Sequence, residues 1–206
     1  MLLVCLDLEG VLVPEIWIGV AERTGIEELR RTTRDEPDYD KLMRYRLGIL
    51  DRHGLGIAEI QQTIGELEPL PGAADFVAEL RSWAQLVILS DTFYPFGMPL
   101  MKQLGQPTLF CHDLEISDSG RILNYNLRQA DPKRRAVEAF HGLNFKVLAA
   151  GDSYNDTSML SEADAGILFR PPDNVIREFP QFPVVETHAA LHAELRAAAE
   201  RVETAG

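Results

Sequence analysis

Two acids stand directly after the first apolar run of the chain, one residue apart. The sequence begins MLLVCLDLEGVLVPE, so Asp7 and Glu9 flank a single leucine and Gly10 follows. If residues 2–8 form a buried strand, both carboxylates leave the sheet at its carboxyl end, on the same side of the extended chain. Like charges this close are costly unless a cation lies beside them or one carboxyl is protonated. From this motif alone, a cation site and a strand end with two solvated acids are equally good interpretations.

A second group of acids lies in GDSYND, residues 151–156, directly after the apolar run FKVLAA. Asp152 lies at the tip of this predicted strand, and Asp156 follows one turn later if a helix begins near Ser153. Alone, the segment is better explained as a helix N-terminus, because Asp, Ser and Asn are preferred capping residues. Beside an acid cluster at another strand end, it predicts a Mg²⁺ site, since this ion prefers carboxylate oxygens.

Two weaker features complete the set. SDT at residues 90–92 follows LVIL, and Lys133 in ADPKRR opens a predicted helix. Separately, they would be an ordinary turn and a solvated lysine. Together with the acid clusters they supply what phosphoryl transfer needs: a nucleophile, a divalent cation, a fixed positive charge, hydroxyl or amide donors, and an acid for the leaving oxygen.

Short apolar runs alternate with helical patterns along the chain, and these elements must position the polar groups. The predicted strands are residues 2–8, 86–90, 145–151 and 165–169, with 184–187 as a weaker fifth. The predicted helices are residues 72–84, 94–105, 131–142 and 189–202. Runs that are apolar on both faces suit the buried strands of a parallel sheet. The alternation therefore predicts a doubly wound α/β domain.

Two segments interrupt this alternation. Residues 15–67 carry several helical patterns and no convincing strand, and PLPG closes the segment. We interpret it as a helical cap over the sheet, which predicts a cap domain of residues 15–69 and a core domain of residues 1–14 and 70–206. The other segment, LEISDSGRILNYN at residues 114–126, predicts a β-hairpin around SDSG.

The overall charge restricts the partners. The formal net charge is -12 and the pI is about 4.8, so the chain repels nucleic-acid backbones, and we expect no nucleic-acid partner. An anionic substrate would need local positive charge, which Mg²⁺ and Lys133 would supply. We expect small molecules as partners, and the oligomeric state stays open, with a homodimer among the alternatives.

The two cysteines and the apolar runs bear on the compartment. Cys5 and Cys111 lie in apolar stretches without a CxxC pair, which predicts reduced core thiols in a cytoplasmic protein. No apolar stretch approaches the ~20 residues that a membrane span requires, so we expect no membrane partner.

Two histidines have a spacing that suits zinc. His188 and His192 stand four residues apart in a predicted helix, but no third ligand of the usual kind lies nearby. We therefore predict a surface helix there. No Ser-His-Asp or Cys-His arrangement is apparent.

Four ordered motifs carry a resemblance to a known family. DLEGVL at residues 7–12, SDT at 90–92, Lys133, and GDSYND at 151–156 resemble, in order and strand-end placement, the motifs of the haloacid dehalogenase superfamily. The resemblance covers nearly the whole chain and implies the Rossmann-like core of that superfamily. The helical cap between the first two motifs is similar to that of its phosphoserine phosphatases.

The resemblance implies a role for each motif residue. Asp7 would attack phosphorus and become an aspartyl phosphate. Mg²⁺ would be held by Asp7, the backbone carbonyl of Glu9, and Asp152, with Asp156 in support. The residues implied to bind the phosphoryl oxygens are Ser90, Asp91, Lys133 and Asn155.

Glu9 departs from the pattern of the superfamily. An aspartate usually stands at this position and acts first as general acid and then as general base. The extra methylene of Glu9 moves the carboxyl group by about 1.5 Å. Either this is a neutral change that the rotamer absorbs, or the site favours a phosphoryl acceptor other than water.

The D-x-E-G start with SDTF at 90–93 resembles a branch with both phosphoserine phosphatase and homoserine phosphotransferase activity. This resemblance implies phosphoserine as donor and homoserine as acceptor.

An amino-acid substrate needs partners for its own charges. An acid for the ammonium and an arginine for the carboxylate are the usual solution. Glu15, at the start of the predicted cap, suits the ammonium. Arg46 matches the position at which phosphoserine phosphatases bind the substrate carboxylate, and its neighbour Arg44 is the alternative. For each of the three, a solvated helix charge is the competing interpretation.

Other functions remain as rivals. Signalling receiver domains also combine a phosphorylated aspartate, a hydroxyl residue, a lysine and Mg²⁺ on a doubly wound sheet. Their aspartate lies on a middle strand and they have no helical cap, whereas Asp7 lies on the first predicted strand. A phosphatase of the same superfamily for another small metabolite and an inactive scaffold are the remaining alternatives.

Overall fold

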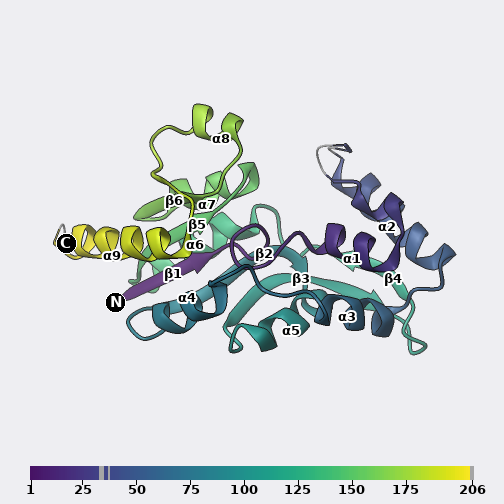
Figure 1. The fold of residues 1–206 in the computed structure, drawn as a ribbon. Helices are drawn as coiled ribbons and strands as arrows, with labels where there is room; N and C mark the ends of the chain where they lie inside the picture. The colour runs from purple at the N-terminus through teal and green to yellow at the C-terminus, as the bar shows by residue number, and fades with distance from the viewer. Residues whose placement is uncertain (33–34, 37, 205–206) are drawn as a thin grey trace.

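A seven-stranded sheet runs through the part of the chain that the computed structural model describes, residues 1–32, 35–36 and 38–204 (Figure 1). The strand order is β4-β3-β2-β1-β5-β6-β7. Neighbouring strands pair in parallel except β3 and β4, which are antiparallel. The strands are β1 (Leu2–Leu6), β2 (Gln85–Phe93), β3 (Thr108–Ile116), β4 (Ile122–Asn126), β5 (Lys146–Gly151), β6 (Ala165–Phe169) and β7 (Val184–Val185). This confirms the predicted α/β fold with its mainly parallel sheet.

Helices connect the strands and form the segment after β1. The α-helices are α1 (Ile16–Thr24), α2 (Tyr39–Arg52), α3 (Ile57–Gly65), α4 (Ala73–Leu80), α5 (Tyr94–Gln103), α6 (Pro132–Gly142), α7 (Thr157–Glu162), α8 (Asp173–Glu178) and α9 (His188–Thr204). Two 3₁₀ helices are η1 (Glu27–Arg30) and η2 (Tyr154–Asp156). The four predicted helices correspond to α4, α5, α6 and α9. The helical segment η2 and α7 begins directly after Ser153, where GDSYND indicated a helix N-terminus, and α8 was not predicted. No helix of the described residues has the length and apolar character needed to cross a membrane.

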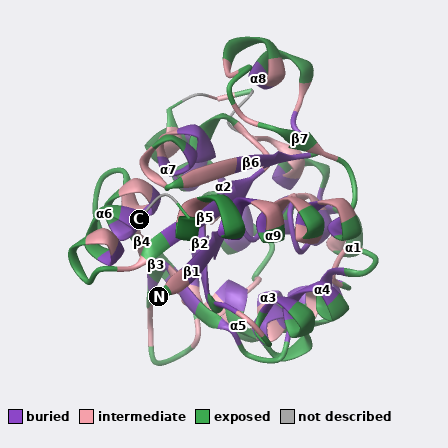
Figure 2. Ribbon diagram, turned by 90° about the vertical axis from the view of Figure 1, so that its left-hand side faces the viewer, coloured by how far each residue is buried: buried purple, intermediate pink, exposed green. Residues whose placement is uncertain are grey.

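Both faces of the sheet are covered. Val4 and Leu6 of β1 belong to one apolar cluster, together with residues of α4, α5 and α9. Leu3 and Cys5 point to the other face and join a second cluster with α6, α7 and α8. Strand β1 is therefore apolar at every position because alternate side chains enter two different cores. Figure 2 shows the buried residues gathered on the strands and the exposed ones on the outer helix faces.

The segment between β1 and β2 is helical, as predicted. Helices α1, α2 and α3 lie together at one end of the molecule beside β4, away from both termini (Figure 1). Leu70 N–H donates to the Leu12 carbonyl at 2.8 Å, so the chain enters and leaves this segment at adjacent points. The first apolar cluster continues from the sheet into these helices through residues such as Ile49 and Ile60. The division into a cap of residues 15–69 and a core stays a prediction, and both ranges include residues outside the described ones (33, 34, 37, 205 and 206).

The predicted hairpin is present but longer than expected. Strand β3 begins at Thr108, because its first half pairs with β2 before its second half pairs with β4. The hairpin also contacts α2: the Arg121 guanidinium donates to both carboxylate oxygens of Asp51, at 2.6 and 3.0 Å. The Tyr125 hydroxyl donates to Asp40 at 2.6 Å. The hairpin thus extends the sheet to the helices that follow β1.

The prediction for the two histidines of α9 is wrong for His188. Its ring is buried between Phe169 and Phe76, and its nitrogens lie 2.8 Å from the Val11 carbonyl and 3.1 Å from the Pro71 carbonyl. Both carbonyls come from distant parts of the chain, so helix periodicity gave no sign of this burial. His192 accepts a hydrogen bond from the Trp83 indole at 3.2 Å.

Cys5 and Cys111 are buried free thiols, as predicted. Burial raises the pKa of both, that of Cys111 to about 12, so neither is a reactive thiolate at neutral pH.

Candidate active site

The predicted strand 2–8 ends at Leu6, and the chain then turns sharply. Asp7 N–H still donates to the Ala150 carbonyl of β5 at 2.9 Å, after which Leu12 N–H donates back to the Leu8 carbonyl at 2.9 Å. Gly10 makes this turn possible, with φ of +78°. A Cβ at Gly10 would overlap the Asp152 carboxylate, so the two loops are in direct contact. The first and fourth predicted motifs therefore meet at the carboxyl edge of the sheet.

Lys133 lies among three carboxylates of this edge. It is the first residue on the buried face of α6 and only 3% exposed. Its Nζ lies 2.8 Å from Asp7 Oδ1, 2.7 Å from Asp156 Oδ1 and 3.5 Å from Asp91 Oδ2. Burial by itself would lower the pKa of Lys133, but the carboxylates, with Asp156 first, raise it well above its ordinary value. The lysine is a fixed positive charge, as phosphoryl transfer requires.

Asp156 is fully buried and both its oxygens have partners. Oδ1 accepts from Lys133, and Oδ2 accepts from the backbone N–H groups of Asp152 and Ser153 at 3.0 and 3.1 Å. A Cβ at Gly151 would overlap the Asp156 side chain, which explains the glycine at the end of β5. Asp156 thus holds both its own loop and Lys133 in place.

The cluster carries more negative than positive charge. Asp7, Asp152 and Asp156 offer oxygens within 4.8 Å of one another, the only such group of metal-ligating side chains among the described residues. Burial first, and the Asp156 carboxylate second, raise the pKa of Asp152 to about 7 and that of Asp7 well above its ordinary range. One lysine cannot balance these acids together with Asp91. The donor set therefore fits a hard divalent cation such as Mg²⁺.

The second motif lies on β2 rather than on a turn after it. Ser90 is buried, and its Oγ accepts from Thr92 N–H at 3.2 Å. The Asp91 carboxylate accepts from the Asn155 amide at 2.8 Å and faces Lys133. The structure therefore brings Ser90, Asp91 and Asn155 to the same edge as Asp7.

Glu9 contacts the start of the helical segment. Its Oε2 accepts from the backbone N–H of Ile16, in the first turn of α1, at 2.8 Å. Burial and then the neighbouring Glu15 carboxylate raise the pKa of Glu9 to about 8, although Ile16 N–H, Lys133 and Arg46 act in the opposite direction. A carboxyl whose pKa is raised in this way toward neutral pH suits a group that gives up and takes back a proton.

Of the two candidate arginines, Arg46 is the one that lies near Glu9. Arg46 shares the buried face of α2 with apolar residues and is 7% exposed. Its guanidinium lies 4.6 Å from the Trp17 ring centroid and donates to the Arg31 carbonyl at 2.8 Å, while its Nε is buried without a partner. Burial lowers the pKa of Arg46 to about 10, although Tyr39, Glu9 and Glu15 oppose this. Arg44 is exposed and pairs with Asp40 at 2.7 Å instead.

Two neighbours of the site were not predicted from the sequence. Tyr39, at the start of α2, packs edge-on against Tyr125 at 5.7 Å between ring centroids. Burial and then the Asp91 carboxylate raise the pKa of its hydroxyl, so Tyr39 belongs to the electrostatic surroundings of the acids. His112 of β3 lies behind Asp91. Neither belongs to a recognisable motif, and only the pairing of distant segments shows their position.

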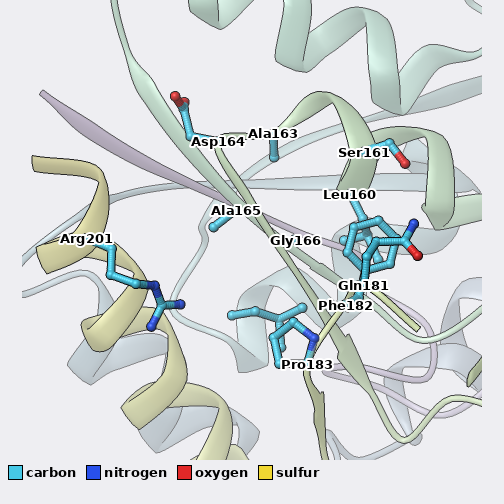
Figure 3. Close-up of a pocket in the computed structure, with 11 residues that line it drawn as sticks. Leu160, Ser161, Ala163, Asp164, Ala165, Gly166, Gln181, Phe182, Pro183 and Arg201 are labelled. Atoms are coloured by element: carbon cyan, nitrogen blue, oxygen red, sulfur yellow. The ribbon is translucent and has the colours of Figure 1, made fainter. Parts of the chain in front are cut away.

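A separate cavity of about 480 Å³ lies at the opposite edge of the sheet (Figure 3). Its two charged groups already have partners: Asp164 accepts from Val147 N–H at 2.8 Å, and Arg201 donates to Glu194 at 2.8 Å. Asp164 precedes β6, so this cavity opens at the amino end of that strand. Ligands of parallel sheets bind at the carboxyl ends, which favours the Asp7 cluster as the active site.

Comparison with known proteins agrees with this geometry. Residues 1–164 match the family described as haloacid dehalogenase-like hydrolase. Over 197 residues the chain is 64% identical to phosphoserine phosphatase ThrH of Pseudomonas aeruginosa. The matched residues cover 96% of each chain. It is also 64% identical to a phosphoserine phosphatase of Pseudomonas syringae, over 96% of this chain and 83% of that one. The fold resembles a crystal structure of an apo phosphoserine phosphatase with a TM-score of 0.73 at 21% identity, over 90% of this chain and 94% of that one.

Proposed function

Because the chain belongs to the haloacid dehalogenase-like hydrolase family, we propose that it is a Mg²⁺-dependent phosphoserine phosphatase that also transfers the phosphoryl group to homoserine. The observation that carries the chemistry is Asp7, buried and 2.8 Å from the buried Lys133 at the carboxyl edge of the sheet. The names of the two relatives at 64% identity support phosphoserine as the substrate. The cytoplasm as its location stays a prediction, and the oligomeric state stays open, with a homodimer among the alternatives.

The reaction takes two displacements at phosphorus. In the first, an Asp7 oxygen forms a bond to phosphorus, the bond to the serine oxygen breaks, and Glu9 gives its proton to that oxygen. In the second, Glu9 takes a proton from water or from the homoserine hydroxyl, whose oxygen bonds to phosphorus as the bond to Asp7 breaks. Splitting the transfer in this way replaces one difficult step by two easier ones.

The other residues of the cluster bind and neutralise. Lys133, Ser90 and Asn155 would hold the phosphoryl oxygens, and the Asp91 carboxylate contacts Lys133 and Asn155. Asp7, Asp152 and the backbone of Glu9 would hold Mg²⁺, with Asp156 behind them. When bound, the ion would neutralise charge on the phosphoryl oxygens.

Arg46 and Glu15 would bind the amino-acid end of the substrate. The buried Nε of Arg46 has no partner, and a substrate carboxylate would supply one. Glu15 is exposed, and its charge acts on both Glu9 and Asp152, which supports it as the partner of the ammonium group. Serine and homoserine share these two charged groups, so one pocket would serve both.

Product analysis tests the proposed function. With phosphoserine and Mg²⁺ we expect free phosphate, and with homoserine added we expect phosphohomoserine at the expense of free phosphate, both resolved by phosphorus NMR. Chelation of the metal should stop both products. Phosphate release that saturating homoserine leaves unchanged would contradict the transfer, and no release from phosphoserine would contradict the substrate.

Arg46→Ala should weaken the use of phosphoserine selectively. We expect kcat/KM for phosphoserine to fall about 10–100-fold, the equivalent of about 1.5–3 kcal/mol for a hydrogen bond to a charged group. An aryl phosphate, which lacks the carboxylate, should change far less. The matched control is Arg44→Ala, two residues away but exposed and paired with Asp40. Equal losses on both substrates would remove Arg46 from substrate recognition.

A further inference from the structure

His112 is a buried polar residue beside the active site that the proposed chemistry does not use. It lies on β3 opposite Phe93 of β2 and is 4% exposed. Its ring packs at a tilt against the Phe93 ring, with 6.4 Å between centroids. A buried imidazole needs polar partners for its nitrogens, so the partners of His112 show what it does.

Hydrogen bonding fixes the orientation of the His112 ring. The backbone N–H of Arg128 donates to His112 Nδ1 at 3.1 Å, so Nδ1 acts as an acceptor. The ring proton is therefore on Nε2. This nitrogen lies 3.7 Å from Asp91 Oδ1, just beyond hydrogen-bond distance, so the N–H acts on the carboxylate as a nearby dipole. The backbone after β4 thus turns the N–H of His112 toward the Asp91 carboxylate.

The other oxygen of Asp91 faces the phosphate-binding residues. Asp91 Oδ2 accepts from Asn155 Nδ2 at 2.8 Å and lies 3.5 Å from Lys133 Nζ. Burial would raise the pKa of Asp91, but Lys133, then His112 and Asn155, lower it overall, so the carboxylate is ionised. Asp91 therefore links β3 to the loop after β5 and to the start of α6.

We propose that His112 is a positioning residue of this site: through Nε2 it orients the Asp91 carboxylate, which in turn holds Lys133 and Asn155 against the phosphoryl group. The inference rests on the proposed function. The partners of the His112 ring nitrogens are Arg128 N–H and Asp91, so His112 acts on the site through Asp91. Its acceptor nitrogen is occupied by Arg128 N–H, so it is not a base for the reaction.

Two His112 variants, a double-mutant cycle with Asp91→Asn and one control variant test this role. His112→Phe keeps a ring but removes the N–H. We expect kcat for phosphoserine to fall about 10–100-fold, the usual loss when a residue that orients a functional side chain is replaced. His112→Gln keeps a donor at the place of Nε2 and should recover most of this loss. In the Asp91→Asn background, His112→Phe should cost little more, because its effect passes through Asp91. Cys111→Ala, equally buried on the same strand, is the control for core packing.

Crystal structures of the variants give a readout that does not depend on activity. We expect the hydrogen bond between Asn155 and Asp91 to be lost in His112→Phe and retained in His112→Gln. Equal kcat losses for the two His112 variants, additive losses with Asp91→Asn, or an unmoved Asp91 in His112→Phe would overturn the proposal. A wild-type protein that hydrolyses no phosphate ester would instead refute the proposed function, while the structures would still decide whether His112 orients Asp91.

Discussion

Asp7→Asn is expected to reduce turnover of phosphoserine at least about 1,000-fold, which corresponds to about 4 kcal/mol of activation free energy. An amide is a far weaker nucleophile than a carboxylate, so the bond to phosphorus would not form. The remaining contacts survive, because an asparagine oxygen still accepts from Lys133 and from Leu8 N–H, as Asp7 Oδ1 does at 2.8 and 2.7 Å. Rates are measured by phosphate release, with the variant checked by mass for deamidation.

The same variant should not lose stability. Asp7 is one of four acids around a single lysine, and burial and Asp156 both oppose its charge. Removing that charge relieves repulsion, so we expect a melting temperature equal to or above that of the wild type. Asp164→Asn, at the opposite edge of the sheet, is the control for activity. Residual turnover above about a thousandth of the wild-type rate would count against Asp7 as nucleophile.

Trapping gives a second check on Asp7. Acid quenching during turnover of the wild type should leave a protein heavier by one phosphoryl group, and peptide mapping should place it on Asp7. Asp7→Asn should show no such species. A phosphoryl group found on another residue would overturn the proposed sequence of displacements.

The strands that are apolar on both faces were predicted well from the sequence. Strands β1, β5 and β6 each lie within a predicted run to within a residue or two, because burial on both sides leaves no room for polar residues. The beginning of β3 was missed, since His112 and Asp113 interrupt its apolar pattern. Helices α7 and α8 have six residues each, too few for a helical period to be visible.

The candidate site, too, was only partly predictable from the sequence. Acids at strand ends were predictable, because parallel strands bring their carboxyl ends to one edge. Lys133 was also predicted to join them, but the partners of Glu9 and Asp91 on other elements were not. The Glu9 carboxylate accepts from Ile16 N–H, a contact that depends on where α1 begins and that no motif indicated. Likewise, only the path of β3 places His112 behind Asp91. Sequence patterns show which groups reach the edge, whereas the contacts among them depend on the packing of distant elements.

Lys133→Met is expected to reduce both activity and stability. The Lys133 ammonium lies 2.7–3.5 Å from the carboxylates of Asp7, Asp91 and Asp156. Without it, these three carboxylates would lose the positive charge that they share. Removing one partner of a buried ion pair costs about 3–5 kcal/mol, and we expect a loss of unfolding free energy of that order in the absence of metal. Turnover of phosphoserine should fall by at least about 100-fold, because a fixed positive charge on the phosphoryl oxygens is lost.

The metal dependence of this variant separates the two losses. Mg²⁺ should raise the melting temperature of Lys133→Met more than that of the wild type, because the cluster then has a greater excess of negative charge for the ion to neutralise. Activity should not return, since the ion cannot take the place of Lys133 on the phosphoryl oxygens. Lys146→Met is the matched control: this lysine is half-exposed and pairs with Asp164 at 3.5 Å, so its loss should cost little. If Lys133→Met melted like Lys146→Met and kept its turnover, the buried lysine would be neither the balancing charge of the cluster nor a phosphate ligand.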